Sequence, residues 1–180
     1  MPRPEPRADL SLHLVAGEEP LLSPADIYRR YCRYVGAVIL RLDGRASDLE
    51  DLIQDVFVEA TAGLSRLRDP EAIRGWLATI AVRTVRRRLR LRRLTRLFFE
   101  SAETVEGIDA AASPQDRLLL RAVYRVLDEM PTDDRIAFCL HRLEGETIEA
   151  VAKLCACSIA TVKRRVARAQ KRVEERVGDV

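Results

Sequence analysis

The sequence has few of the residues from which enzymes build active sites. It contains two His and one Trp among 180 residues, and the two His stand far apart, at positions 13 and 141. The patterns HExxH, GxxxxGKS/T and GxSxG, which mark metalloproteases, nucleotide-binding loops and serine hydrolases, do not occur. An enzyme such as a recombinase or nuclease is therefore the least favoured class of function, and the sequence predicts no catalytic residue.

Long hydrophobic runs are also missing. A membrane-spanning helix needs about 20 consecutive apolar residues, and the longest apolar runs here are far shorter. Residues 1–10 lack the apolar core of a secretion signal. These absences predict a cytoplasmic protein with no membrane insertion.

Cysteine is scarce, with four residues at positions 32, 139, 155 and 157. Because thiolate and imidazole are natural zinc ligands, Cys139-x-His141 and Cys155-x-Cys157 are compatible with a metal site. However, CxC is not the usual CxxC spacing, and Cys155 falls on the apolar stripe of a predicted helix. The favoured interpretation is that the cysteines are buried as small hydrophobic side chains, so no metal or cofactor is predicted.

The charge is nearly balanced overall but strongly segregated along the chain. The formal net charge is +3, yet residues 83–96 hold eight Arg and no acid, while residues 100–112 hold four acids and no base. Segregation of this kind favours an anionic partner such as nucleic acid.

Apolar residues recur at helical spacing, and nowhere do they alternate as they would in a strand. The sequence therefore predicts an all-α fold with two small helical domains. Residues 1–22 contain four Pro and no periodicity, which predicts a disordered tail. The first domain is expected over residues 23–97, with helices at 24–43, 48–67 and 71–94. Ser23 and Ser47 are the expected caps of the first two helices.

Residues 98–112 are predicted to be an acidic linker, and a second domain of four helices is expected over 113–178. Ser113 opens a helix whose apolar stripe includes Leu118 and Leu119 and ends at Pro131, and another helix is expected over 133–143. Each domain has only about 65 to 75 residues. Docking onto a larger partner is therefore expected to contribute to their stability.

Residues 147–168 have the pattern of a helix–turn–helix. One helix ends near Cys155, Ser158 is a good N-cap for the next, and Ala152 is small where the two helices must cross. The second helix should turn Ile159, Val162 and Val166 inward. Between these residues stand cations that could lie on DNA phosphates while the helix occupies the major groove. The alternative interpretation is an ordinary helical hairpin with a solvated charged face.

Two further motifs occur in a recognisable order. Residues 48–57 (DLEDLIQDVF) followed by 74–81 (RGWLATIA) resemble region 2 of bacterial sigma factors. Residues 127–131 (LDEMP), then 143–145 (LEG) and the helix containing Thr161-Val162-Lys163, resemble region 4. Since no sizeable domain separates them, the chain resembles the extracytoplasmic-function (ECF) group. This resemblance implies a three-helix region 2 bundle and a four-helix region 4 domain.

The resemblance also implies a role for each surface. The second helix would bind the β′ clamp coiled coil of core RNA polymerase through Asp48, Asp51, Leu52, Gln54 and Asp55, with the β subunit as a further contact. The third helix and the loop over 67–72 would open and read the −10 promoter element through Arg68, Arg74, Trp76, Arg83, Arg86, Arg87 and Arg90. The helix–turn–helix would read the −35 element through Ser158, Ala160, Thr161, Lys163, Arg164, Arg165 and Arg168. An anti-sigma factor is a further candidate partner.

The sequence departs from the family pattern at several positions. The family often has Asn at the position of Arg83, Asp at that of Arg87, an aromatic residue near Ala78, and glycine at the turn position Ala156. The extra arginines put ordinary −10 recognition in doubt and predict a steeper dependence of DNA affinity on salt. A stand-alone dimeric helix–turn–helix regulator is the alternative function. It predicts palindromic sites and leaves the acidic second helix unexplained.

Overall fold

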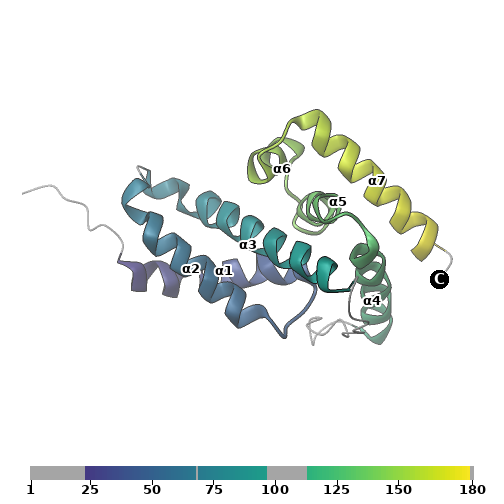
Figure 1. Cartoon of the computed structure of the whole chain (residues 1–180), viewed down its shortest axis with the longest axis horizontal. Coiled ribbons are helices and arrows are strands. Elements are labelled where there is room, and N and C mark those ends of the chain that lie inside the picture. The colour runs from purple at the N-terminus through teal and green to yellow at the C-terminus, as the bar shows by residue number, and fades with distance from the viewer. Residues whose placement is uncertain (1–22, 68, 97–112, 179–180) are drawn as a thin grey trace, which may run out of the picture.

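The computed structural model describes residues 23–67, 69–96 and 113–178, and within these ranges it contains helices and no strand (Figure 1). The α-helices are α1 (Pro24–Asp43), α2 (Leu49–Gly63), α3 (Ile73–Arg96), α4 (Pro114–Glu129), α5 (Thr132–Phe138), α6 (Ile148–Cys155) and α7 (Ile159–Val177). The predicted all-α fold is confirmed. The predicted tail, the acidic linker and Arg68 lie outside the described residues.

Serine caps begin α1 and α4, the first helices of two groups, α1–α3 and α4–α7. The Oγ of Ser23 accepts the backbone N–H of Asp26 at 3.1 Å, and Asp26 accepts the N–H of Ser23 at 3.3 Å, so two donors of the first turn are satisfied. Ser113 accepts the N–H of Asp116 at 3.1 Å at the start of α4. Both predicted helix starts are therefore confirmed.

The second helix is shorter than predicted, and its expected cap is wrong. It begins at Leu49 after Asp48, so Ser47 is one residue too early to cap it. It ends at Gly63 rather than Leu67, and 3-10 turns at Leu64–Arg66 and Pro70–Ala72 lead into α3. After these turns, Trp76 of α3 packs closely on the end of α2. A Cβ added to Gly63 would lie only 3.0 Å from the indole ring.

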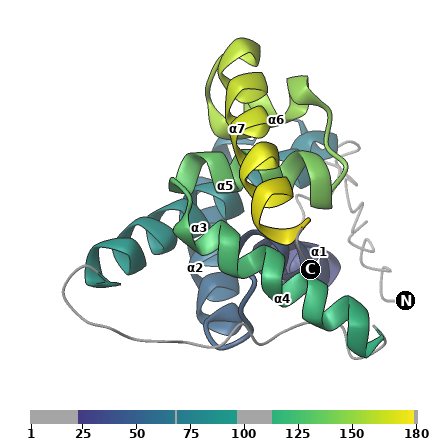
Figure 2. The ribbon, with the colours of Figure 1, turned by 90° about the vertical axis from the view of Figure 1, so that its right-hand side faces the viewer.

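Three residues predicted to face inward are exposed. Leu118 and Leu119 are 66% and 50% exposed, because the first half of α4 extends past the end of α7 (Figure 2). Ile159, the first residue of α7, is 44% exposed. The predicted helix over 133–143 is interrupted: α5 ends at Phe138, and a π-helical turn follows over Cys139–Leu143.

The two groups of helices share one core. The buried apolar residues form a single cluster that runs from α1–α3 into α4–α7, and α3 packs against α5 and α6 (Figure 1). Each small domain therefore gains apolar burial from the other. The predicted contribution of a larger partner to stability stays a prediction.

Buried polar groups fasten α4 and α5 to the end of α1. The buried guanidinium of Arg135 donates to the carbonyl of Leu42 at 3.0 Å and to that of Asp43 at 2.7 Å, and it also pairs with Asp128. The Tyr124 hydroxyl donates to the carbonyl of Arg41 at 2.7 Å. The last carbonyls of a helix carry partial negative charge, so a cation there is stabilising. The carbonyls of Arg41, Leu42 and Asp43 at the end of α1 thus bind α4 and α5, and we call this group of carbonyls the socket.

The helix–turn–helix turn contains backbone strain that can be tested. Ala156 has φ 51°, the left-handed region that favours glycine. We expect Ala156→Gly to raise the free energy of unfolding by about 1 kcal/mol, measured by urea denaturation. Gly145→Ala is the matched control, because Gly145 has φ 73° with open space around a Cβ, and it should lower stability by a similar amount. A loss of stability in Ala156→Gly would contradict this assignment.

Candidate functional site

The helix–turn–helix is present as α6 and α7, and a side-chain hydroxyl caps the start of each helix. The Oγ1 of Thr147 accepts the N–H of Ala150 at 3.1 Å, and the Oγ of Ser158 accepts the N–H of Thr161 at 3.2 Å. Val162 is fully buried, as predicted for the residue that anchors the second helix. The Ser158 and Thr161 hydroxyls also lie 2.9 Å apart, so local hydrogen bonds hold both of them at the start of α7.

The cations of α7 fall into two sets. Arg165 lies 3.1 Å from Asp133, and Arg168 makes two hydrogen bonds to Asp134, at 2.7 and 3.1 Å, which raise the Arg168 pKa. Ala160, Lys163 and Arg164 are exposed. Lys163 and Arg164 have no ion-pair partner among the residues that the structure describes. Among the α7 cations predicted to contact the −35 element, these two are therefore the most available to an external ligand.

Six arginines of α3 pair with carboxylates: Arg83, Arg86, Arg87, Arg88, Arg90 and Arg92. Arg83 pairs with Glu59, and Arg87 pairs with Asp55 at 3.1 Å; both acids belong to α2. Arg86 and Arg90 instead face Asp133 of α5. The two cations that depart from the family pattern, Arg83 and Arg87, thus join α3 to α2.

A hollow lies beside the start of α3. It has a volume of about 680 Å³ and is lined by Arg30, Tyr31, Tyr34, Pro70, Glu71 and Arg74. The Arg74 guanidinium carbon lies 4.4 Å from the centre of the Tyr34 ring, within cation–π range. Trp76 does not line this hollow. Sequence reasoning missed the two tyrosines, although arginine and tyrosine recur together over residues 29–34.

The acidic face of α2 is only partly open. Asp51 and Gln54 are exposed, whereas Leu52 is buried in the core, so Leu52 offers no surface to a partner. Asp48 accepts hydrogen bonds from Arg88 at 2.6 and 3.0 Å and from Arg92 at 2.9 Å. Burial alone would raise the pKa of Asp48, but these hydrogen bonds lower it overall. Asp48 therefore holds α2 to α3.

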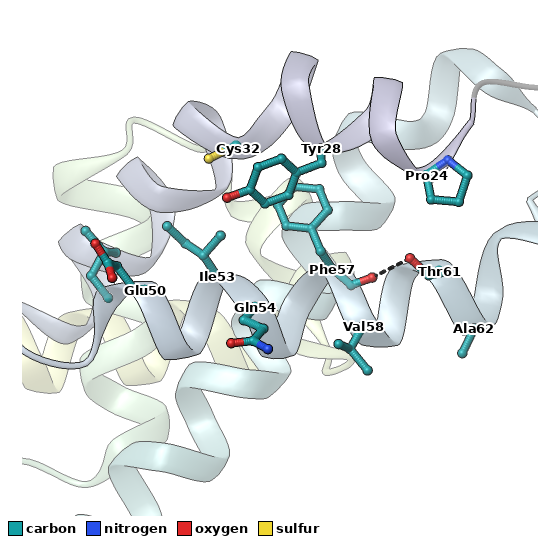
Figure 3. A pocket seen from close by; sticks show the side chains of 11 residues that line it. Pro24, Tyr28, Cys32, Glu50, Ile53, Gln54, Phe57, Val58, Thr61 and Ala62 are labelled. Atoms are coloured by element: carbon teal, nitrogen blue, oxygen red, sulfur yellow. Dashed lines mark hydrogen bonds between the residues drawn. The ribbon is translucent and has the colours of Figure 1, made fainter.

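An apolar groove runs between α1 and α2 on the face shown in Figure 3. Its volume is about 1080 Å³, and its lining includes Tyr28, Ile53, Phe57 and Val58. The Tyr28 and Phe57 rings meet edge to face with centroids 4.9 Å apart, yet Val58 is 64% exposed. Sequence reasoning missed this groove because Val58 lies on the otherwise polar face of α2. Exposed apolar patches of this kind mark binding surfaces.

The cysteines differ in burial. Cys139 is completely buried, and burial raises its pKa to about 12; burial also raises the pKa of Cys155. Cys32 and Cys157 are half-buried. No three His, Cys, Asp or Glu side chains are grouped as a metal site within the described ranges.

This difference predicts selective alkylation. With iodoacetamide at pH 8, Cys32 and Cys157 should react in the native protein, while Cys139 should react only after unfolding, because the thiolate is the reactive form. Peptide mass spectrometry before and after denaturation measures this. Rapid native modification of Cys139 would contradict the described core.

Among the helices described, none has the length and apolarity needed to span a membrane.

Comparison with known proteins gives the family. A sigma-70 region 2 model matches residues 27–95, and a sigma-70 region 4 model matches residues 120–173. The ECF RNA polymerase sigma-E factor of Escherichia coli K12 is 26% identical over 159 residues, covering 82% of this chain and 83% of that protein. The RNA polymerase sigma-H factor of Pseudomonas aeruginosa is 29% identical over 157 residues, covering 81% of each.

Two solved structures share the fold. One is the sigma factor RpoE in complex with the anti-sigma factor NepR from Bartonella quintana, with a TM-score of 0.68, 24% identity, and coverage of 86% of this chain and 98% of that one. The other is CnrH in complex with the cytosolic domain of CnrY, with a TM-score of 0.58, 23% identity, and coverage of 84% and 85%. With both family regions matched in order on an all-α fold, the chain belongs to the sigma-70 family of RNA polymerase sigma factors, within the ECF group.

Proposed function

We propose that this sigma factor binds core RNA polymerase and directs initiation at promoters with −35 and −10 elements. The observation that supports this most is the division of surfaces: an acidic face on α2 with an apolar groove between α2 and α1, and cations on α3 and α7. On this proposal the chain performs no covalent chemistry. Its binding energy positions the polymerase, which makes the RNA.

The −35 element would be read by α7 in the major groove. Lys163 and Arg164 are exposed near the start of α7, and a lysine or arginine there can donate to guanine O6 and N7. Ser158 and Thr161 lie at the cap, where hydroxyls suit phosphate contact. Arg165 and Arg168 would reach phosphate only by leaving Asp133 and Asp134.

The −10 element would be opened at the start of α3. Unstacking a base costs a few kcal/mol, which a pocket for the extruded base can offset. The hollow beside Tyr31, Tyr34 and Arg74 is supported for this role by its two aromatic rings and its cation, since bases stack on such groups. Arg83, Arg86, Arg87 and Arg90 would hold the strand or the upstream duplex. The packing of Trp76 on Gly63 supports a structural role for that indole.

Core polymerase would dock on α2. Asp51, Gln54 and Asp55 offer a polar surface with two carboxylates, which suits a basic partner such as the β′ clamp coiled coil. The apolar groove beside them would add contact area. One solved neighbour, RpoE, was determined with the anti-sigma factor NepR, which supports an anti-sigma partner for this chain too.

Footprinting with core polymerase on a target promoter tests the proposal. We expect protection of the −35 region, together with thymines near −10 that react with permanganate because they are unpaired. Protection of a palindromic duplex by the chain alone, as a dimer and without permanganate reactivity, would replace the proposal with a stand-alone regulator.

A further inference from the structure

Asp133 brings together cations from both proposed DNA-binding surfaces. It lies in the first turn of α5. Its carboxylate is 3.2 Å from Arg90 of α3 and 3.1 Å from Arg165 of α7. The Nε of Arg86 lies 3.1 Å from the same carboxylate, close enough for an ion pair but outside hydrogen-bond geometry. One acid therefore holds two arginines proposed for the −10 side and one proposed for the −35 side.

The charge at this point is unbalanced. Three guanidinium groups share one carboxylate, so the cluster keeps an excess of positive charge. Like charges at such distances repel one another, and partial exposure keeps the cluster accessible to ions. A DNA phosphate could therefore replace Asp133, and each arginine it released would gain a partner.

The packed arrangement cannot occupy both elements together. The elements lie about 25 base pairs apart, or about 85 Å at 3.4 Å per base pair. The proposed −10 surface lies on α3, whose 24 residues span about 36 Å, and Arg165 of the proposed −35 surface shares Asp133 with Arg90 of α3. The helices that carry α7 pack directly on α3 and on the end of α1. Simultaneous binding requires the two groups of helices to separate.

From these observations, and resting on the proposed function, we infer that the free chain is self-inhibited by a latch centred on Asp133. In the latched form Asp133 forms ion pairs with Arg86, Arg90 and Arg165. The socket at the end of α1 holds α4 and α5. Promoter phosphate competes with Asp133. Separation of the helix groups then frees both DNA-binding surfaces.

Asp133→Asn tests the latch, because it removes the charge while keeping the size of the side chain. Without polymerase, we expect this variant to bind promoter duplex several-fold more tightly than the wild type and to have a larger radius of gyration by small-angle scattering. Glu129→Gln is the matched control. It removes the same charge from a pair, Glu129 with Arg176, that lies within α4 and α7. It should leave the radius of gyration unchanged and alter DNA affinity less.

If Asp133→Asn changes DNA affinity no more than Glu129→Gln and stays as compact as the wild type, the latch is overturned. Asp133→Ser is a second variant that keeps a helix-starting residue, and circular dichroism verifies that each variant is folded. The wild-type footprint with core polymerase separates the two proposals. It persists if only the latch is wrong, and it is missing if the sigma-factor function is wrong.

Discussion

Arg135→Met is expected to lower the free energy of unfolding by about 3 kcal/mol, although methionine nearly fills the same space. Removing one partner of a buried charge pair leaves the other without compensation in the interior. Here the change would also strip two carbonyls at the end of α1 of their donor. Asp128 keeps its pair with Arg45 at 2.7 Å, which is why we expect the lower end of the usual range. Urea denaturation followed by circular dichroism measures the effect.

The control is Arg176→Met, because Arg176 pairs with Glu129 on the surface with both side chains at least half exposed. Exposed pairs contribute about 0 to 1 kcal/mol, so this variant should stay close to the wild type. If both variants shifted stability equally, the end of α1 would not be the socket that joins the two groups of helices.

Arg164→Ala is expected to weaken binding of the holoenzyme to its promoter by about 10- to 100-fold, since a good contact to a base edge is worth about 1–3 kcal/mol. Arg164 is exposed near the start of α7, in a helix positioned by buried Val162. The loss should be concentrated at one base pair of the −35 element. Competition binding with single-base promoter variants measures this.

Lys171→Ala is the matched control for Arg164→Ala. Lys171 is also an exposed cation of α7, but it lies two turns further on and pairs weakly with Glu175 at 3.8 Å. It should change affinity by only a small factor, equally for every sequence. A uniform loss in Arg164→Ala, with no position of the promoter more affected than another, would assign Arg164 to phosphate instead.

The helices could be predicted from sequence because their signals are local. Apolar spacing and the Ser-Pro starts depend on neighbours within a turn or two, and the turn at Ala156 follows from the spacing of the two helices that it joins. The end of α2 could not be predicted in this way. Its apolar period continues to Leu67, whereas the helix ends at Gly63, where Trp76 of another helix packs closely.

The roles of the arginines were less predictable. A run of eight Arg without an acid predicts a phosphate-binding surface, but Arg83 and Arg87 find their partners in Glu59 and Asp55 of α2. Asp133 lies more than 40 residues from Arg86 and Arg90 in sequence, so its position between two helices is a property of the tertiary fold. The predicted steep salt dependence therefore concerns arginines that must first exchange an internal carboxylate for a phosphate.

Burial also separates structural from surface residues within one motif. Leu52 and Asp51 are adjacent in sequence, yet Leu52 packs in the core while Asp51 is exposed. Tyr31 and Tyr34 have both roles: each is partly buried against the core, and each also lines the hollow beside Arg74. A family motif locates a surface, and the fold decides which of its residues reach a partner.

Transcription in vitro tests the central claim most directly. Core polymerase would be supplied with fragmented genomic DNA of the source organism, with and without the chain, and the 5′ ends of the transcripts would be sequenced. We predict new start sites that share two upstream motifs, near −35 and near −10, and that disappear when Asp51 and Asp55 are both changed to Lys. Tight binding of the chain to DNA with no new start site would contradict the claim, and would indicate a regulator that cannot open promoters.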